Sequence, residues 1–426
     1  MKMLRAAAQA ICIIVSTFVI PLMSSAALGK AAPYSTTPLR SSHSVLPEFG
    51  LLLACCSQSR SAEADARIHS LIREGIDWTR FLRLLERHGV LPLAHPNLLT
   101  CKDSIPTEVL SHLRERSTAQ VRRALWLTQV LYKVIQAFAE AGIPCLPHKG
   151  PVLAQRLYGD VAMRDYCDLD LFVRPTDVAS ARDALRKIGL VPHTSLRPKE
   201  QDSLLACGYE LGFDGLGNNN LVELQWRLLP RFYSIRLAVD DLFAGAQSCA
   251  MAGIQVQTLG DEDLALTLCA HAAKHAWSRL CWTCDIAQLI RVSHIDWSRV
   301  TARAQVLGIT RILAVSMLLA RRMLGAAVPA ELEPIMQDPA IHTLAGDILA
   351  RISNDTGIDP ESIPYFRLML RIRERASDRM RFLTRLITTP TESEWSLVKL
   401  PDCLFPLYRG VRVYRLLGRL LQINQA

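Results

Sequence analysis

The chain has 426 residues, of which 50% are hydrophobic and 21% are charged, and its formal net charge is +9. This composition is ordinary for a globular protein, and the length allows two or three domains with a sizeable core. The twelve cysteines are too few and too scattered for a disulfide framework, which is typical of a reducing compartment. The basic excess lies at the two ends of the chain, and no stripe of aromatics and lysines indicates a nucleic-acid groove.

Residues 1–45 predict a signal-like extension followed by a linker. Residues 6–29 carry no charge, follow Lys2 and Arg5, and contain a run of small residues at positions 25–27. This pattern is typical of a secretory signal peptide or a single membrane anchor. A mis-assigned start codon would also produce such an extension. Residues 30–45 are rich in Ser, Pro and Thr and indicate a linker.

Residues 46–142 predict an N-terminal helical region. Asp77 supplies an N-cap signal for a helix that contains Phe81. A long helix is expected over residues 107–141. Only Thr128 interrupts the later part of the apolar stripe expected along this helix, which consists of Leu110, Leu113, Val121, Leu125, Leu131 and Ile135.

Residues 143–260 predict a small mixed sheet with helices. The expected elements are a strand over residues 143–146, a helix through Leu153 and Leu157, a strand over residues 168–173, an amphipathic helix over residues 175–188 that Gly189 ends, and a hairpin of residues 209–213 and 221–226. From Asp261 to the end the pattern is helical, which gives a C-terminal helical region over residues 261–426. The predicted fold class is therefore α+β, with a small mixed sheet flanked by helical regions.

Two aspartates on the predicted strand over residues 168–173 form the first candidate site. Asp168 and Asp170 are two residues apart, so both carboxylates point to the same face of that strand. Two like charges so close together are unfavourable unless a cation lies between them. Oxygen ligands of this kind suit Mg²⁺, which commonly binds one or two carboxylates and completes its shell with substrate phosphates. The alternative is an exposed strand face with two solvated aspartates, but the apolar neighbours of the pair argue against it.

Two further features, one before this pair in the sequence and one well after it, add to the candidate site. Lys149 and Gly150 stand at a strand-to-helix junction, where a helix N-terminus offers backbone N–H groups to a phosphate and Gly150 permits close approach. By itself, this junction would be an ordinary tight turn. Glu223 lies on a later predicted strand in an apolar neighbourhood, where a carboxylate requires a partner.

At this point the sequence resembles the bacterial family of uncharacterised nucleotidyltransferases, members of the DNA polymerase beta superfamily. The resemblance spans roughly residues 46–420. It rests on His148-Lys149-Gly150, Leu157-Tyr158-Gly159-Asp160, Met163-Arg164, Asp168-Leu169-Asp170-Leu171, Val222-Glu223-Leu224-Gln225-Trp226-Arg227, residues 271–280, and Cys284-Asp285-Ile286.

The resemblance implies a nucleotidyltransferase core over residues 143–260 with defined site residues. Asp168, Asp170 and Glu223 would be the metal ligands and catalytic carboxylates. The residues implied to bind the nucleotide are Lys149, Gly150, Arg164 and Lys274. The implied cofactor is Mg²⁺ or Mn²⁺. Two departures stand out: Lys149-Gly150-Pro151 replaces the superfamily's usual Gly-Ser or Gly-Gly, and Gln225 stands where His is more common.

The helical segment after Asp261 adds residues with two interpretations. His271 and His275 are four residues apart and share a helix face, either to position an acceptor or as packing residues. Cys281 and Cys284 could be read with these histidines as a zinc site, or alone as a redox pair. The zinc site is poorly supported, because His275 and Cys281 are six residues apart and the stretch reads as one helix into Ile286. The redox pair is no better supported, because no thioredoxin-like strand–helix pattern surrounds it.

Two functions follow from the sequence. The first is a metal-dependent transferase that moves a nucleoside monophosphate from a nucleoside triphosphate, which we expect to be ATP, to an unknown hydroxyl on a small molecule, sugar or protein. The second is a nucleotide-binding accessory or scaffold protein of the same fold with weak catalysis. A triphosphate-using enzyme belongs in the cytosol, so we expect a cytoplasmic protein, with membrane contact through residues 6–29 as the alternative.

Overall fold

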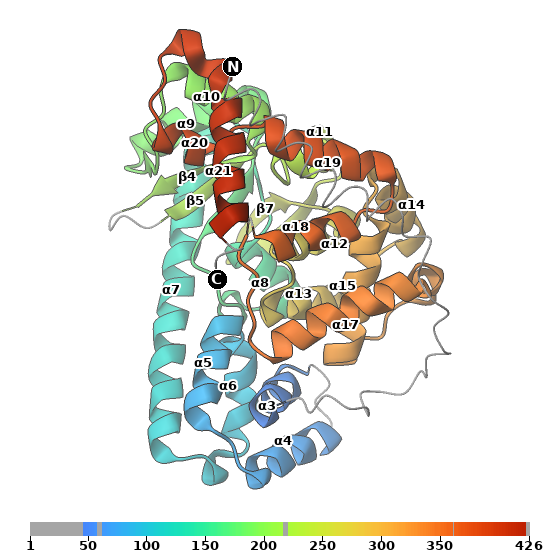
Figure 1. Cartoon of the computed structure of the whole chain (residues 1–426). Helices are drawn as coiled ribbons and strands as arrows, with labels where there is room; N and C mark the ends of the chain where they lie inside the picture. Colours follow the sequence, from blue (N-terminus) through green and yellow to red (C-terminus); the bar gives the residue numbers. More distant parts are fainter. Residues whose placement is uncertain (1–45, 58–61, 216–219, 361, 423–426) are drawn as a thin grey trace.

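A computed structural model of the chain describes residues 46–57, 62–215, 220–360 and 362–422. The extension predicted over residues 1–45 and most of the hairpin loop at residues 216–219 lie outside the described residues. Within the described part, no helix is both long enough and apolar enough to span a bilayer. The chain is mostly helical, with a five-stranded mixed sheet in the middle, so the predicted α+β class is confirmed (Figure 1).

The N-terminal region is helical, as predicted. The Asp77 carboxylate accepts a hydrogen bond from the Arg80 backbone N–H at 3.0 Å and caps α5, which confirms that signal. The long α7 runs along one side of the molecule, from the N-terminal helices to the sheet (Figure 1). The helices are α3 (Pro47–Cys56), α4 (Ala62–Glu74), α5 (Trp78–His88), α6 (Leu91–Leu99) and α7 (Thr107–Glu140).

The predicted apolar stripe of α7 is wrong in its middle part. Val121 and Leu125 are 36% and 52% exposed, whereas Thr128 is buried and donates its hydroxyl to the Ala124 carbonyl at 2.8 Å. The helix contacts α6 near its start, and α8 and α9 along its remaining length. Because its partners change, its buried face is not one straight stripe of large apolar residues.

The sheet has the strand order β1-β2-β5-β4-β3, with β2 and β5 parallel and the other pairs antiparallel. Its first strand lies later than predicted, at Leu146–Pro147 rather than residues 143–146. The sequence analysis also missed the short edge strand β3 and a separate two-stranded hairpin, β6–β7. The strands are β1 (Leu146–Pro147), β2 (Leu169–Phe172), β3 (Val191–Pro192), β4 (Glu210–Asp214), β5 (Asn220–Gln225), β6 (Gln247–Met251) and β7 (Ile254–Thr258).

The two faces of the sheet belong to different hydrophobic clusters. Leu169 and Leu171 pack in one cluster with residues of α7 and α9, whereas Phe172 packs in the larger cluster that joins the N- and C-terminal helices. Side chains of a strand alternate between faces, so Asp170 shares its face with Phe172. This alternation aims the predicted carboxylates toward the C-terminal helices. The helices around the sheet are α8 (Gly150–Tyr158), α9 (Val178–Lys187), α10 (Pro198–Cys207) and α11 (Val239–Ala244).

The C-terminal region is helical. The sequence pattern predicted one continuous helix over residues 271–286, and this prediction is wrong. The chain leaves α12 at His275 and enters α13 at Leu280 through a turn in which Ala276 and Trp277 have φ of 54° and 51°. Such left-handed residues cost about 1–3 kcal/mol each and persist only where the surroundings fix them. Here the Trp277 backbone N–H donates to Ala272 and its indole N–H donates to Ser316.

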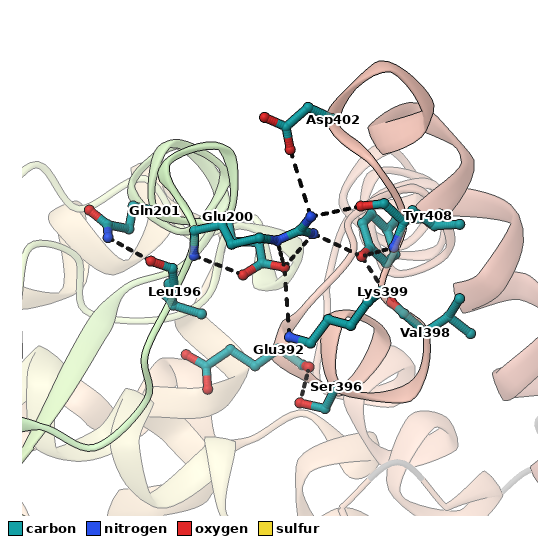
Figure 2. A network of polar contacts seen from close by, with 11 residues as sticks. Leu196, Glu200, Gln201, Glu392, Ser396, Val398, Lys399, Asp402 and Tyr408 are labelled. Atoms are coloured by element: carbon teal, nitrogen blue, oxygen red, sulfur yellow. Dashed lines mark hydrogen bonds and ion pairs between the residues drawn. The ribbon is translucent and has the colours of Figure 1, made fainter.

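The last helices fold back onto the sheet region. Arg197 of α10 donates to Glu200 and to the Tyr408 hydroxyl, and Lys399 lies 4.0 Å from Glu200, so the chain end is fixed against α10 (Figure 2). These helices are α12 (Asp261–Lys274), α13 (Leu280–Val292), α14 (Trp297–Leu307), α15 (Thr310–Leu324), α16 (Glu333–Met336), α17 (Pro339–Ser353), α18 (Ile363–Arg371), α19 (Ala376–Thr388), α20 (Glu392–Leu397) and α21 (Tyr408–Gln422).

Candidate active site

The predicted carboxylates meet because β2 and β5 are adjacent parallel strands. Asp170 pairs in register with Glu223, and Asp168 lies directly before β2. Neighbouring strands are about 4.8 Å apart, so the two in-register carboxylates stand side by side on one face. The Gln225 amide donates to Asp170 at 2.9 Å and to Glu223 at 3.3 Å. The residue that departs from the superfamily pattern therefore bridges two of the three acids.

The turn before α8 packs directly against the strand that carries the acids. Gly150 has φ +58°, and a Cβ atom there would lie 3.2 Å from the Asp168 carbonyl oxygen. Only glycine fits without strain, which explains why this residue stands at the strand-to-helix junction. Lys149 is the N-cap residue of α8, but its side chain makes no capping bond. The N-terminus of α8 therefore faces the carboxylates as a potential anion site.

Lys149 is already paired in this arrangement. Its ammonium group lies 2.7 Å from Asp170, and both side chains are almost fully buried. Burial works against the charge of Lys149, but Asp170 outweighs burial and raises the lysine's pKa. Burial likewise works against the charge of Asp170, but Lys149 and the other surrounding groups lower its pKa to about 2. The two residues form a buried ion pair at the centre of the site.

At the other two acids, burial and the neighbouring carboxylates outweigh the effect of Lys149. Burial, followed by the nearby Asp170, raises the pKa of Asp168 to about 6. Burial and the charge of Asp170 also raise the pKa of Glu223, to about 9. The cluster therefore holds more negative charge than its surroundings stabilise, and Glu223 is protonated at neutral pH. An added cation would relieve that repulsion.

The carboxylates open into a cavity of about 540 Å³. This volume lies within the range of about 300–1,000 Å³ that is usual for small-molecule sites. All seven predicted site residues contribute to the site, six of them as part of the cavity wall and Gly150 through the turn beside it. The six are Lys149, Arg164, Asp168, Asp170, Glu223 and Lys274.

The wall opposite the sheet comes from α12, α13 and the turn between them. The rings of His271 and His275 lie 4.7 Å apart, and both contact Trp282, at 5.4 and 5.0 Å between centroids. Burial lowers the pKa of His275 to about 3 and that of His271 well below its ordinary value, so both imidazoles are neutral. The three rings form an uncharged aromatic surface. Sequence reasoning missed Trp282, although it follows the histidines at helical spacing.

Sequence reasoning also missed Tyr209 and Glu210, through which Lys274 contacts the sheet. The Lys274 ammonium donates to the Tyr209 hydroxyl at 2.5 Å and lies 4.3 Å from the centre of the Tyr209 ring. The Tyr209 hydroxyl in turn donates to Glu210, which is opposite Gln225 in the β4–β5 pair. Burial lowers the pKa of Lys274, so its ammonium group loses a proton more readily than that of a solvated lysine. The signal available in the sequence was the acid at position 210 on an otherwise apolar strand.

Arg164 is anchored by a buried acid. Its Nε donates to Asp285 at 2.9 Å, and the Tyr158 hydroxyl donates to the same carboxyl at 3.0 Å. Arg164 and Asp285 are 8% and 1% exposed. Burial raises the pKa of Asp285, and Arg164 opposes that effect. The two motifs that carried the family resemblance at residues 163–164 and 284–286 thus meet in one structural unit.

The donor set fits a hard divalent cation in its chemistry. Three carboxylates from adjacent strand positions supply the oxygen ligands that Mg²⁺ prefers. Within the described residues, no three His, Cys, Asp or Glu side chains are grouped as a ready metal site. Lys149 and Gln225 both donate to Oδ1 of Asp170, so a cation bound by this carboxylate would share it with the lysine or displace it.

Cys281 and Cys284 lie on α13 and are 7% and 0% exposed. Cys281 contributes to the cavity wall, whereas burial and the neighbouring Cys56 thiol raise the pKa of Cys284 far above its ordinary value. Both thiols are protonated at neutral pH and are poor nucleophiles.

Comparison with known proteins gives one family. A family model described as an uncharacterised nucleotidyltransferase matches residues 74–325, which is more than half of the chain and includes every predicted site residue. No curated protein and no solved structure matches the chain.

Proposed function

We propose that this chain, which belongs to the uncharacterised nucleotidyltransferase family, transfers a nucleoside monophosphate from a nucleoside triphosphate to an acceptor hydroxyl. The observation that carries the proposal is the in-register pairing of Asp170 with Glu223 in a cavity of nucleotide size. Asp168, two residues before Asp170, lines the same cavity. The acceptor oxygen would form a bond to the α-phosphorus while the bond from that phosphorus to the pyrophosphate breaks.

Asp168, Asp170 and Glu223 are the residues that would hold the metal ions. A bound Mg²⁺ or Mn²⁺ would neutralise phosphate charge and polarise the reacting oxygens. Without a cation, burial and the neighbouring acids raise the pKa of Glu223 and keep it protonated at neutral pH. A bound cation would favour its ionised form, and the Glu223 carboxylate would then accept the proton of the acceptor hydroxyl as the new bond forms.

The basic residues around the cavity would orient the triphosphate, which we expect to be that of ATP. The N-terminus of α8 at Gly150 presents backbone dipoles to a phosphate. Lys149 would move from Asp170 to a phosphate oxygen when the nucleotide and the metal enter, since both new partners improve the charge balance of the site. Lys274 and the part of the Arg164 guanidinium beyond Nε would contact the remaining phosphates.

A second function, a nucleotide-binding accessory or scaffold protein with weak catalysis, is favoured by one specific observation. The Lys149–Asp170 ion pair satisfies the central carboxylate without any metal ion. A protein that had lost catalysis could retain this pair as a structural element.

Titration calorimetry of ATP and GTP, with and without Mg²⁺, tests the proposal. The wild type is expected to bind a triphosphate only with the metal, and Asp168→Asn with Asp170→Asn is expected to abolish that dependence. The double substitution opens no cavity but leaves the buried Lys149 without its charged partner, so the melting temperature is measured alongside, and Asp168→Asn alone serves as a second variant that keeps the Lys149–Asp170 pair. Equal affinity in every condition would reject the transferase and leave the accessory protein. Labelled triphosphates incubated with lysate would then identify the acceptor.

A further inference from the structure

A second cavity lies beside the candidate active site and has no role in the function proposed above. It has a volume of about 240 Å³ and is formed between α10, β4 and the start of α20; we call it the C-terminal cavity. It shares Tyr209 and Glu210 with the wall of the catalytic cavity. One tyrosine and one carboxylate therefore stand between the two spaces.

The C-terminal cavity contains a buried donor that has no partner. Trp395 is 2% exposed and lines the cavity, and its indole N–H has no hydrogen-bond acceptor among the described residues. Buried polar groups in folded proteins are nearly always satisfied, and each exception calls for an explanation. A ligand that offers an oxygen atom to this N–H would remove the cost of leaving it unpaired.

The charge of the cavity is one-sided. Glu210 and Glu392 both line it, and no Lys, Arg or His stands among the described residues of its wall. Burial raises the pKa of Glu392, and the charge of Glu210 adds to that effect, so the two carboxyls act on each other across the space. A cation between them would be stabilised, whereas an anion would be repelled. The rest of the wall includes apolar surface from Phe232, Pro230 and Pro390.

The wall is built firmly enough to hold a ligand. Glu394, which is completely buried, accepts hydrogen bonds from the Thr391 backbone N–H at 2.7 Å and from Arg412 at 3.2 Å. Arg415 donates to the same carboxylate. These bonds fix the start of α20 to α21, and the contacts of α10 with the chain end fix the opposite wall (Figure 2). The cavity is therefore a feature of the folded chain end.

We propose that the C-terminal cavity binds the acceptor, and that the acceptor is a small molecule with a cationic amine as well as the reacting hydroxyl. The role of the bound molecule as acceptor rests on the proposed function, whereas the existence of the binding site does not. Glu392 would pair with the amine, and Trp395 would donate to a hydroxyl oxygen. The reacting hydroxyl would point past Tyr209 and Glu210 toward the catalytic carboxylates.

Binding without nucleotide tests the inference separately from catalysis. The probes are ethanolamine and glucosamine as amino alcohols, glucose as a neutral ligand and glucose 6-phosphate as an anion, each titrated into the full-length protein by saturation-transfer NMR at neutral pH, because the raised pKa of Glu392 would cost it its charge in acid. Glucosamine should bind more tightly than glucose, and glucose 6-phosphate should show no binding that depends on Glu392 or Trp395. Loss of a charged partner weakens binding by roughly 10- to 100-fold, which is the effect expected for Glu392→Gln on the amines.

Trp395→Phe keeps an aromatic side chain but removes the N–H together with the rest of the five-membered ring. It should weaken sugar binding by about two- to tenfold, and the melting temperature of the free protein should fall because the smaller ring leaves space in a buried wall. A merely structural role for Trp395 would lower the melting temperature without weakening sugar binding at temperatures where the variant is folded. The matched controls are Trp126→Phe and Glu108→Gln, both at exposed positions of α7, which should leave binding unchanged.

The possible outcomes separate the two proposals. Amine binding that depends on Glu392 and Trp395, in a protein that shows no metal-dependent nucleotide binding, would keep the cavity and reject the transferase. Transferase activity that is unaffected by both substitutions would keep the transferase and overturn the cavity as the acceptor site. No binding of either amine, or binding of glucose 6-phosphate that Glu392→Gln strengthens or Trp395→Phe weakens, would overturn the inference outright.

Discussion

Asp170 and Glu223 are paired in register on the two parallel strands of the sheet, so a carboxylate held charged by Lys149 lies beside one that burial and repulsion keep protonated. Without a cation, burial and repulsion between the acids raise the electrostatic free energy of the folded protein. In the transferase we propose, each acid would have a different part: Asp170 would remain an anion, and Glu223 would exchange a proton with the acceptor.

The first prediction concerns stability against pH in a metal chelator. The ordinary pKa of a glutamate is 4.5, and that of folded Glu223 is about 9, so between these values the folded protein holds a proton that the unfolded chain has released. Stability therefore falls as pH rises through this window. Glu223→Gln should remove that slope and melt at a higher temperature than the wild type at alkaline pH. Parallel melting curves of the two proteins would refute the assignment.

Asp170 should give stability the opposite dependence on pH, a loss of stability as the pH falls into the acidic range. Its pKa is lowered from 3.8 to about 2, so its ion pair with Lys149 contributes stability above pH 3.8 that is lost as the pH falls toward 2. Asp170→Asn should lower the melting temperature at neutral pH, because Lys149 remains buried without its charged partner. The difference between the variant and the wild type should shrink in strong acid, as measured by circular dichroism.

The same Glu223→Gln variant separates catalysis from binding. If the carboxyl exchanges a proton with the acceptor, the loss should fall on kcat by about 10²- to 10⁴-fold, with triphosphate affinity nearly unchanged. Single-turnover transfer from labelled ATP, with Glu108→Gln as an exposed control, would measure this once an acceptor is known. An equal loss in affinity and in kcat would place Glu223 in ground-state binding instead.

Gly150 gives a test of the phosphate-facing turn. Gly150→Ala puts a methyl group 3.2 Å from the Asp168 carbonyl at a left-handed φ, which should cost about 1–3 kcal/mol and weaken triphosphate binding. Gly159 ends the same helix with φ +76° and has open space around its Cβ position. Gly159→Ala should therefore destabilise the protein mildly, by about 1 kcal/mol, without changing affinity. Equal losses of affinity in both variants would show a general defect of α8.

Arg164 has both a structural and a binding role to separate. Arg164→Met leaves the buried Asp285 without its partner and should cost about 3–5 kcal/mol, as measured by chemical denaturation. Adding Asp285→Asn should recover part of that stability. If triphosphate affinity stays low in the stable double variant, Arg164 contacts the nucleotide. If affinity recovers with stability, its role is confined to the anchor.

The sequence predicted which candidate residues lie together better than it predicted the structure around them. Alternation along a strand correctly placed Asp168 and Asp170 on one side, because the period of a strand is local. The in-register position of Glu223 could not be derived this way, since pairing of β2 with β5 joins residues far apart in the chain. The family resemblance supplied that link.

The errors have physical causes. The break between α12 and α13 was missed because Ala276 and Trp277 adopt left-handed backbone angles that neither residue type signals. The buried face of α7 was misjudged because the helix changes packing partners along its length. The C-terminal cavity depends on contacts between α10 and α20 from distant parts of the chain, so no local pattern pointed to it.

The last prediction concerns the N-terminal extension. Packing of the folded chain is already established at α3, where Phe49 and Leu51 are fully buried in the larger hydrophobic cluster. A chain that begins at Ser44 is therefore expected to fold with the same melting temperature and solubility as the full chain, because it keeps every residue of that cluster. Differential scanning calorimetry of both proteins tests this. An insoluble or less stable short form would show that residues 1–43 pack against the fold or serve as an anchor, and would argue against a cytoplasmic enzyme.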